Sequence, residues 1–223
     1  MRGTLLGVLL ASIPLSAIAA ELPNVQANEA IALIESARLY RNEGYFYRAE
    51  AQYRSALAIV EQTSGSRSPD LTAALNGLAE LYFEARRYSQ AEACSRRSAA
   101  LVEATLGAAH PLLATALHDL AAIYHVQGQY AKAEPLYRRA LTIRETALGP
   151  DHLFVAATLA NLAELESETG RYDRAAEHYA RAIRIRQEAF GTDDPRVKQT
   201  RAGYAAALRR THSPTDAAQT SLF

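Results

Sequence analysis

The sequence predicts an all-α fold made of one helical hairpin that repeats along the chain. A segment recurs at intervals of 42 residues, as residues 75–82, 117–124 and 159–166 show. Apolar residues inside this segment follow the spacing i, i+3, i+4, i+7, which is typical of one helical face. Glycines recur at the same interval. A fixed period of this length indicates stacked copies of one supersecondary unit.

Composition and charge are those of an ordinary folded protein. The chain has 223 residues, of which 49% are hydrophobic and 22% are charged, and this balance is typical of folded chains. The 24 basic and 24 acidic residues cancel. The net charge therefore gives no overall attraction to nucleic acid or to an anionic membrane. Cys94 is the only cysteine, which excludes an intramolecular disulfide.

The start of the chain has the pattern of an export signal. Arg2 precedes an apolar stretch, and Ala17-Ile18-Ala19 offers the small residues that a signal peptidase reads. We therefore expect residues 1–19 to be a signal peptide that is cut after Ala19. The mature chain is then expected to be exported, either periplasmic or extracellular, without stable membrane insertion.

The alternative for this segment is a membrane anchor over residues 4–20. A membrane-spanning helix needs about 20 apolar residues. The apolar stretch here is shorter and contains Pro14, which favours the signal peptide.

The remaining chain divides into a linker, four repeat units, a closing helix and a tail. Residues 20–28 contain Pro23 among polar residues such as Glu21, Asn24 and Gln26, and are expected to be a linker. The units are expected at residues 29–70, 71–112, 113–154 and 155–196. A capping helix over residues 197–210 would cover the open end of the array, as stacked repeats require. Residues 211–223 are expected to be a flexible tail.

Each unit is expected to form two helices. The first helix has an apolar face of leucine, alanine and tyrosine, which in the third unit consists of Leu117, Leu120, Ala121 and Tyr124. The second helix repeats this spacing, and its face in the same unit consists of Ala133, Tyr137, Ala140 and Leu141. Small alanine opposite large leucine and tyrosine lets two helices approach closely. We predict helices of about 14 to 18 residues joined by short loops.

Glycines and prolines mark the ends of these helices. A positive φ is expected between the two helices of a unit, where the residues are Gly44, Arg86, Gly128 and Gly170. A second glycine series closes the second helices and consists of Gly107, Gly149 and Gly191. The pairs that then begin the next helix are Ser68-Pro69, His110-Pro111 and Asp194-Pro195.

The repeat resembles the tetratricopeptide repeat. The matching pattern is Leu-x-x-Leu-Ala-x-x-Tyr followed by Gly-x-Tyr-x-x-Ala-x-x-x-Tyr-x-x-Ala, and it is clearest over residues 117–140. The long interval resembles the kinesin-light-chain-like variant of this family. The resemblance implies a right-handed α-solenoid of about four helix-turn-helix units with a C-terminal capping helix. Departures from this pattern include Ser36, Arg86, Ser95, Ser98, Glu166 and Arg201.

The resemblance also implies that the chain binds a protein or a peptide. In such arrays the first helices of successive units line a concave groove. The residues expected to face it are Arg38, Arg41, Asn76, Glu80, Phe83, His118, His125, Glu164 and Glu168. Their charges change from basic to acidic along the chain, which favours a partner with its own charge pattern. Any one of them, taken alone, is equally well an ordinary solvated side chain.

No catalytic, metal or cofactor site is predicted. The sequence contains no Gly-x-Ser-x-Gly, no phosphate-binding loop and no Gly-x-Gly-x-x-Gly. His118 and His125 are two helical turns apart, which is about 10 Å of helix and too far to share one metal ion easily. Arginines of the second helices alternate with glutamates in i, i+4 pairs. We therefore expect neither enzyme activity nor a nucleic-acid partner.

Two functions compete on this basis. The first is an exported scaffold or adaptor whose groove binds a peptide or protein segment. The second is a structural, self-associating protein of an envelope assembly or secretion complex. In that case exposed second-helix surfaces, or a poorly capped end of the array, would stack copies into a homodimer, and Cys94 is a candidate for a disulfide between the copies.

Overall fold

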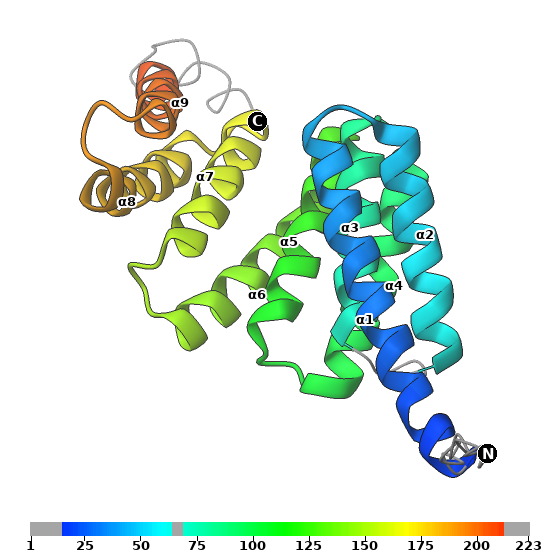
Figure 1. The fold of residues 1–223 in the computed structure, drawn as a ribbon. Coiled ribbons are helices and arrows are strands. Elements are labelled where there is room, and N and C mark those ends of the chain that lie inside the picture. The colour runs from blue at the N-terminus through cyan, green and yellow to red at the C-terminus, as the bar shows by residue number, and fades with distance from the viewer. Residues whose placement is uncertain (1–14, 64–68, 212–223) are drawn as a thin grey trace, which may run out of the picture. The chain divides into compact units, whose positions relative to one another are not determined.

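The protein is all-α. The computed structural model describes residues 15–63 and 69–211, with side chains from residue 25 onward, and the regular secondary structure in these ranges is helical throughout. The helices are α1 Leu15–Asn42, α2 Phe46–Thr63, α3 Pro69–Glu84, α4 Tyr88–Leu106, α5 Pro111–Val126, α6 Tyr130–Leu148, α7 Leu153–Glu168, α8 Tyr172–Phe190 and α9 Pro195–Thr211 (Figure 1). The all-α prediction is confirmed.

The helices divide between two compact units of the chain. The first comprises residues 1–74 and the second comprises residues 75–223. In the first unit, α1 packs against α2. In the second, each helix from α4 to α9 packs against the next one in sequence, which Figure 1 lets the reader follow from green to red. The paired helices α5 with α6 and α7 with α8 are thus the hairpins that the repeat predicts.

Small residues let the helices of the second unit approach one another. Ala133 and Ala140 on α6 have no exposed surface. One buried cluster joins α5, α6 and α7 through Leu120, Tyr137 and Leu162. Another joins α4, α5 and α6 in the same way. Burial of each large side chain contributes about 1.5–3 kcal/mol, and because consecutive clusters share helices, these contacts hold neighbouring hairpins together.

Side chains cap the first helices that begin after each long turn. The Nδ1 atoms of His110 and His152 accept a backbone N–H two residues further on, at 3.2 Å and 3.1 Å. Asp194 accepts the backbone N–H at the start of α9 at 2.8 Å. Each bond satisfies one of the amides that a helix leaves unpaired at its N-terminus. Histidine therefore does in two junctions what serine or aspartate usually does.

The turn inside each hairpin requires a positive φ. Gly44, Gly128 and Gly170 have φ values of 81°, 71° and 77°. Arg86 adopts the same region with a φ of 57°. For a residue with a Cβ atom this conformation is unfavourable. The second repeat unit, residues 71–112, therefore carries backbone strain that the other three repeat units do not.

A polar contact joins α4 to α5. The Tyr124 hydroxyl accepts a hydrogen bond from Arg96 Nη2 at 2.6 Å and donates one to Glu92 Oε1 at 2.8 Å. Arg96 and Glu92 also pair with each other along α4, at 3.0 Å. Arg96 as donor and Glu92 as acceptor thus fix the position of the Tyr124 hydroxyl.

The equivalent contact between α6 and α7 contains a buried charge. Glu166 takes the place of Tyr124 and its side chain has no exposed surface. Arg138 Nη2 lies 3.1 Å from one carboxylate oxygen, and His178 Nδ1 lies 2.7 Å from the other. Arg138 also binds Glu134 at 2.9 Å. Because a buried carboxylate is stable only when it is paired and hydrogen-bonded, these contacts explain how glutamate replaces tyrosine.

The predictions for the two ends of the chain lie mostly outside the described residues. Residues 1–14 and 212–223 are not described, so the signal peptide and the tail stay predictions. The expected linker at residues 20–28 belongs instead to α1, which begins at Leu15. Alanine, leucine, glutamate and glutamine, which are good helix formers, make up most of that stretch. Helix α9 includes the expected cap at residues 197–210.

None of the described helices is both long enough and apolar enough to cross a membrane.

Replacing Arg86 with glycine is expected to raise the free energy of unfolding by about 1 kcal/mol, because glycine adopts a positive φ without Cβ strain. Urea unfolding followed by circular dichroism measures the change. Gly128→Ala is the matched control, since among the described residues no neighbouring atom lies within 4 Å of the added Cβ. It should lower the free energy of unfolding by a similar amount. A destabilised Arg86→Gly variant would show that Arg86 is not strained.

Replacing Arg138 with methionine is expected to lower the free energy of unfolding by about 1–3 kcal/mol, because Glu166 loses a partner while it stays buried. Arg96→Met is the matched variant at the α4 and α5 contact. It leaves a neutral phenol that still binds Glu92, so we expect almost no change. Urea unfolding of both variants decides, and equal effects would show that the buried charge of Glu166 has no special cost.

Candidate functional site

The predicted binding residues all lie on the first helices of their units. In the first compact unit they are Arg38 and Arg41 on α1, and in the second they are Asn76, Glu80 and Phe83 on α3, His118 and His125 on α5, and Glu164 and Glu168 on α7. Each is exposed or half-buried. Several of them bind other side chains of the chain itself.

The predicted basic residues of the first compact unit are Arg38 and Arg41. Arg38 Nη1 lies 2.8 Å from Glu35 Oε1 on the exposed side of α1. Burial raises the pKa of the Tyr53 hydroxyl, and the positive charges of Arg41 and Arg38 oppose this shift. The two arginines therefore place positive charge above a buried phenol and leave the guanidinium of Arg38 exposed.

Three of the predicted residues line one pocket in the second compact unit. Glu80 and Phe83 on α3 and His118 on α5 line a cavity of about 200 Å³. Ser95 on α4 and Asp119 on α5 line it as well. The remaining lining residues are Glu84, Ala79, Ala122 and Ile123. The pocket thus combines carboxyl groups, one aromatic ring and an apolar wall.

His118 is neutral and forms part of the wall. Arg144 Nη1 lies 3.3 Å from its Nδ1, and the Asn161 amide lies 3.2 Å from its Nε2. Burial, with Arg144 acting in the same direction, lowers the pKa of His118 to about 3. Because a guanidinium only donates, Nδ1 accepts the hydrogen bond from Arg144, and the Asn161 atom that lies near Nε2 is Nδ2. His118 therefore connects α5, α6 and α7 and offers a partner no charge.

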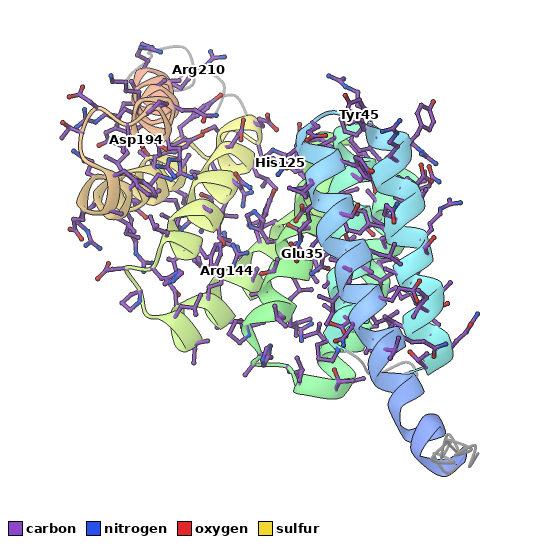
Figure 2. The ribbon with its side chains drawn as sticks, in the orientation of Figure 1. Glu35, Tyr45, His125, Arg144, Asp194 and Arg210 are labelled. Carbon is purple, nitrogen blue, oxygen red and sulfur yellow. The ribbon has the colours of Figure 1, made fainter. Side chains whose placement is uncertain are left out.

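Arg144 is a buried arginine that the sequence analysis did not single out. It is 4% exposed and donates to the backbone oxygen of Phe154 at 3.1 Å and to Thr158 Oγ1 at 2.6 Å (labelled in Figure 2). Arg186 repeats this arrangement one period later with Thr200. The arginine and threonine together replace Val102 and Ala116, their equivalents one period earlier, and this joint change is the signal that could have revealed the pair.

Asn76 supports the interior and is not available to a partner through its oxygen. Its Oδ1 accepts a hydrogen bond from Ser98 Oγ at 2.6 Å. Ser98 has no exposed surface and stands where Ala140 and Ala182 stand in later units. A buried hydroxyl needs a partner, and Asn76 provides it.

Two further predicted residues bind each other. His125 Nε2 on α5 donates to Glu168 Oε2 on α7 at 2.9 Å, and His125 is labelled in Figure 2. The ring of His125 also packs edge-on against Tyr130 and Tyr137, with centroids 5.8 Å and 6.1 Å away. Glu164 is exposed on the same helix as Glu168. The histidine-bearing and acidic parts of the expected groove therefore meet between α5 and α7.

Within the described part of the chain, no group of three or more histidine, cysteine, aspartate or glutamate side chains is arranged to hold a metal ion. The predicted residues offer exposed carboxylates, the exposed guanidinium of Arg38 and a small pocket. Glu80, Phe83 and His118, which the sequence analysis predicted for the binding surface, line this pocket, and Ser95 and Asp119 line it without having been predicted.

Several solved structures resemble this chain. The crystal structure of BtubC (BKLC) from P. vanneervenii superposes with a TM-score of 0.70 at 25% identity, covering 85% of this chain and 84% of that one. A putative kinesin light chain with nearly identical TPR-like repeats from Podosopora anserina gives a TM-score of 0.72 at 22% identity, covering 87% and 91%. A search of curated proteins found no match.

A third structure has a bound partner. The Rap protein complexed with Competence and Sporulation Factor superposes with a TM-score of 0.67 at 19% identity, covering 78% of this chain and 46% of that chain. At this identity, as for the Podosopora anserina protein, the likeness shows the fold alone.

One family model matches this sequence in four windows. The tetratricopeptide repeat matches residues 28–104, 70–146, 112–188 and 156–220, in overlapping windows that together cover most of the chain. The chain belongs to the tetratricopeptide repeat family.

Proposed function

We propose that this protein is an exported interaction scaffold that binds a peptide or protein segment along the first helices of its units. The observation that carries the proposal is the pocket between α3, α4 and α5, which opens beside exposed polar residues of these first helices. A pocket of this kind can accept a side chain of a partner. Family membership supports the proposal, because tetratricopeptide repeats are interaction scaffolds.

The surface favours a partner that carries positive charge. Glu80 on α3 and Glu164 on α7 are both exposed, and Glu168 lies on the same helix as Glu164. His118, between them in sequence, is neutral for the reason given above. Charge complementarity steers the encounter of two proteins and selects against partners of the wrong sign. A basic or mixed-charge segment is therefore the expected ligand in this part of the chain.

Site-specific crosslinking in the source cells tests the binding surface. A photoreactive amino acid at position 80 or 164, on first helices, is expected to capture a partner. The same amino acid at position 97 or 174, which are exposed on the second helices α4 and α8, serves as the matched control and should not. Capture from the second helices alone would contradict the proposed surface. Capture of a second copy of this chain from positions 80 and 164 would favour the self-associating alternative.

Export is tested separately through the mature N-terminus. Residues 1–19 have the charge, apolar core and small residues of a cleaved signal. Mass spectrometry of the protein purified from the envelope or the medium is expected to give Ala20 as the first residue. A cytoplasmic protein that keeps Met1 would refute export and leave the binding surface unaffected.

A further inference from the structure

A tyrosine recurs in the second helices of this chain, and α4 lacks it. Tyr53, Tyr137 and Tyr179 occupy equivalent positions at the 42-residue interval, and all three are buried. Ser95 takes this place on α4 and is 1% exposed. Because a serine side chain is far smaller than a tyrosine ring, the change removes volume from a buried position.

In the second compact unit, the tyrosines of α6 and α8 each contact the helix that follows in sequence, α7 and α9. The Tyr137 hydroxyl bonds to Asn161 on α7. The Tyr179 ring lies so close to α9 that a Cβ added at Gly203 would be 2.7 Å from its Cζ. Both of these contact positions are repeat equivalents of Asp119 on α5. A tyrosine on α4 would therefore point toward Asp119.

The pocket occupies the place of this missing ring. Ser95 and Asp119 both line it. The Oγ atom of Ser95 is buried and has no hydrogen-bond partner among the residues that the structure describes. Folded proteins rarely leave a buried hydroxyl unbonded. An unused polar group thus faces a cavity that the repeat normally fills.

The walls of the pocket favour a cation. Asp119, Glu80 and Glu84 supply three carboxyl groups, and the lining contains neither lysine nor arginine. Burial raises the pKa of Asp119 to about 6, against the opposing charge of Arg144. A positive group in the pocket would stabilise the ionised carboxylate, and the ring of Phe83 is a further favourable surface for it.

We infer that this pocket binds an arginine side chain of the partner peptide or protein. The inference rests on the proposed function and names the chemistry that one part of the surface recognises. A planar guanidinium can donate to the Asp119 carboxylate and to Ser95 Oγ at once, which the single ammonium group of lysine does less well. The methylene groups of the arginine would contact Ala79, Ala122 and Ile123.

Titration of the full chain with N-acetyl-arginine amide, followed by NMR of the Ile123 methyl groups, tests this inference. We expect a saturable shift, and about tenfold weaker binding of the citrulline analogue, which has nearly the same shape without the charge. The methyl groups of Ile183, in the unit where Tyr179 is present, are the internal control and should not shift. Equal binding of the citrulline analogue or of N-acetyl-tyrosine amide, or no saturable shift, would overturn the inference.

Two variants locate the binding in the pocket. Ser95→Tyr restores the ring of the other units and is expected to abolish the shift and to raise the midpoint of thermal unfolding. Asp119→Asn keeps the pocket open, since asparagine stands at the equivalent position 161, and is expected to weaken binding about tenfold. If Ser95→Tyr does not fold, Asp119→Asn decides alone. Undiminished binding by either folded variant would refute the assignment.

The two experiments fail independently. Crosslinks from positions 80 and 164 without an arginine response would uphold the proposed function and refute the arginine pocket. An arginine response that Ser95→Tyr and Asp119→Asn remove would uphold the pocket even if no crosslinks formed, and the proposed groove would then be wrong.

Discussion

A buried tyrosine between neighbouring helices is the constraint on which the later repeats depend. Tyr137 on α6 packs with Leu162 and Leu165 of α7, and Tyr179 on α8 packs with Ala207 of α9. The alanines beside these rings are buried, so the helices are in close contact there. Protein interiors are packed as densely as crystals of small molecules. Each junction therefore has room for its ring, and where serine takes this position the neighbouring helices cannot close the space.

Departures from the repeat are compensated in most places by a change in the adjoining helix. Ser98 replaces alanine, and Asn76 on α3 accepts its hydroxyl. Glu166 replaces tyrosine, and Arg138 and His178 each lie within hydrogen-bond distance of one of its carboxylate oxygens. A buried polar group without a partner costs about 1–3 kcal/mol, which explains why such changes come in pairs. Ser95 differs from Ser98 and Glu166, because its hydroxyl has no hydrogen-bond partner among the described residues.

The periodicity of the sequence was sufficient to predict the hairpins, their glycines and their apolar faces, because each depends on residues a few positions apart. It could not predict which polar side chains of the first helices meet others. Asn76 and His118 have the spacing of surface residues, yet Ser98, Arg144 and Asn161 bind them from other helices. The loss of tyrosine at position 95 was visible in the sequence. Its consequence was not, because a cavity depends on how far the surrounding backbone can move. The prediction of a linker at residues 20–28 was wrong for a different reason. Pro23 does not end the helix there, because the helix formers around it continue α1.

Contacts in the second unit run mainly between helices that are adjacent in sequence. A change at one junction is therefore felt little at the others, as stability in such chains is nearly a sum of local terms. The cavity beside Ser95 belongs to a single junction, so one residue could open or close it while the rest of the stack stays intact. Chains of this kind can thus acquire or exchange a specificity one side chain at a time, with the cost in stability confined to the place where the new ligand binds.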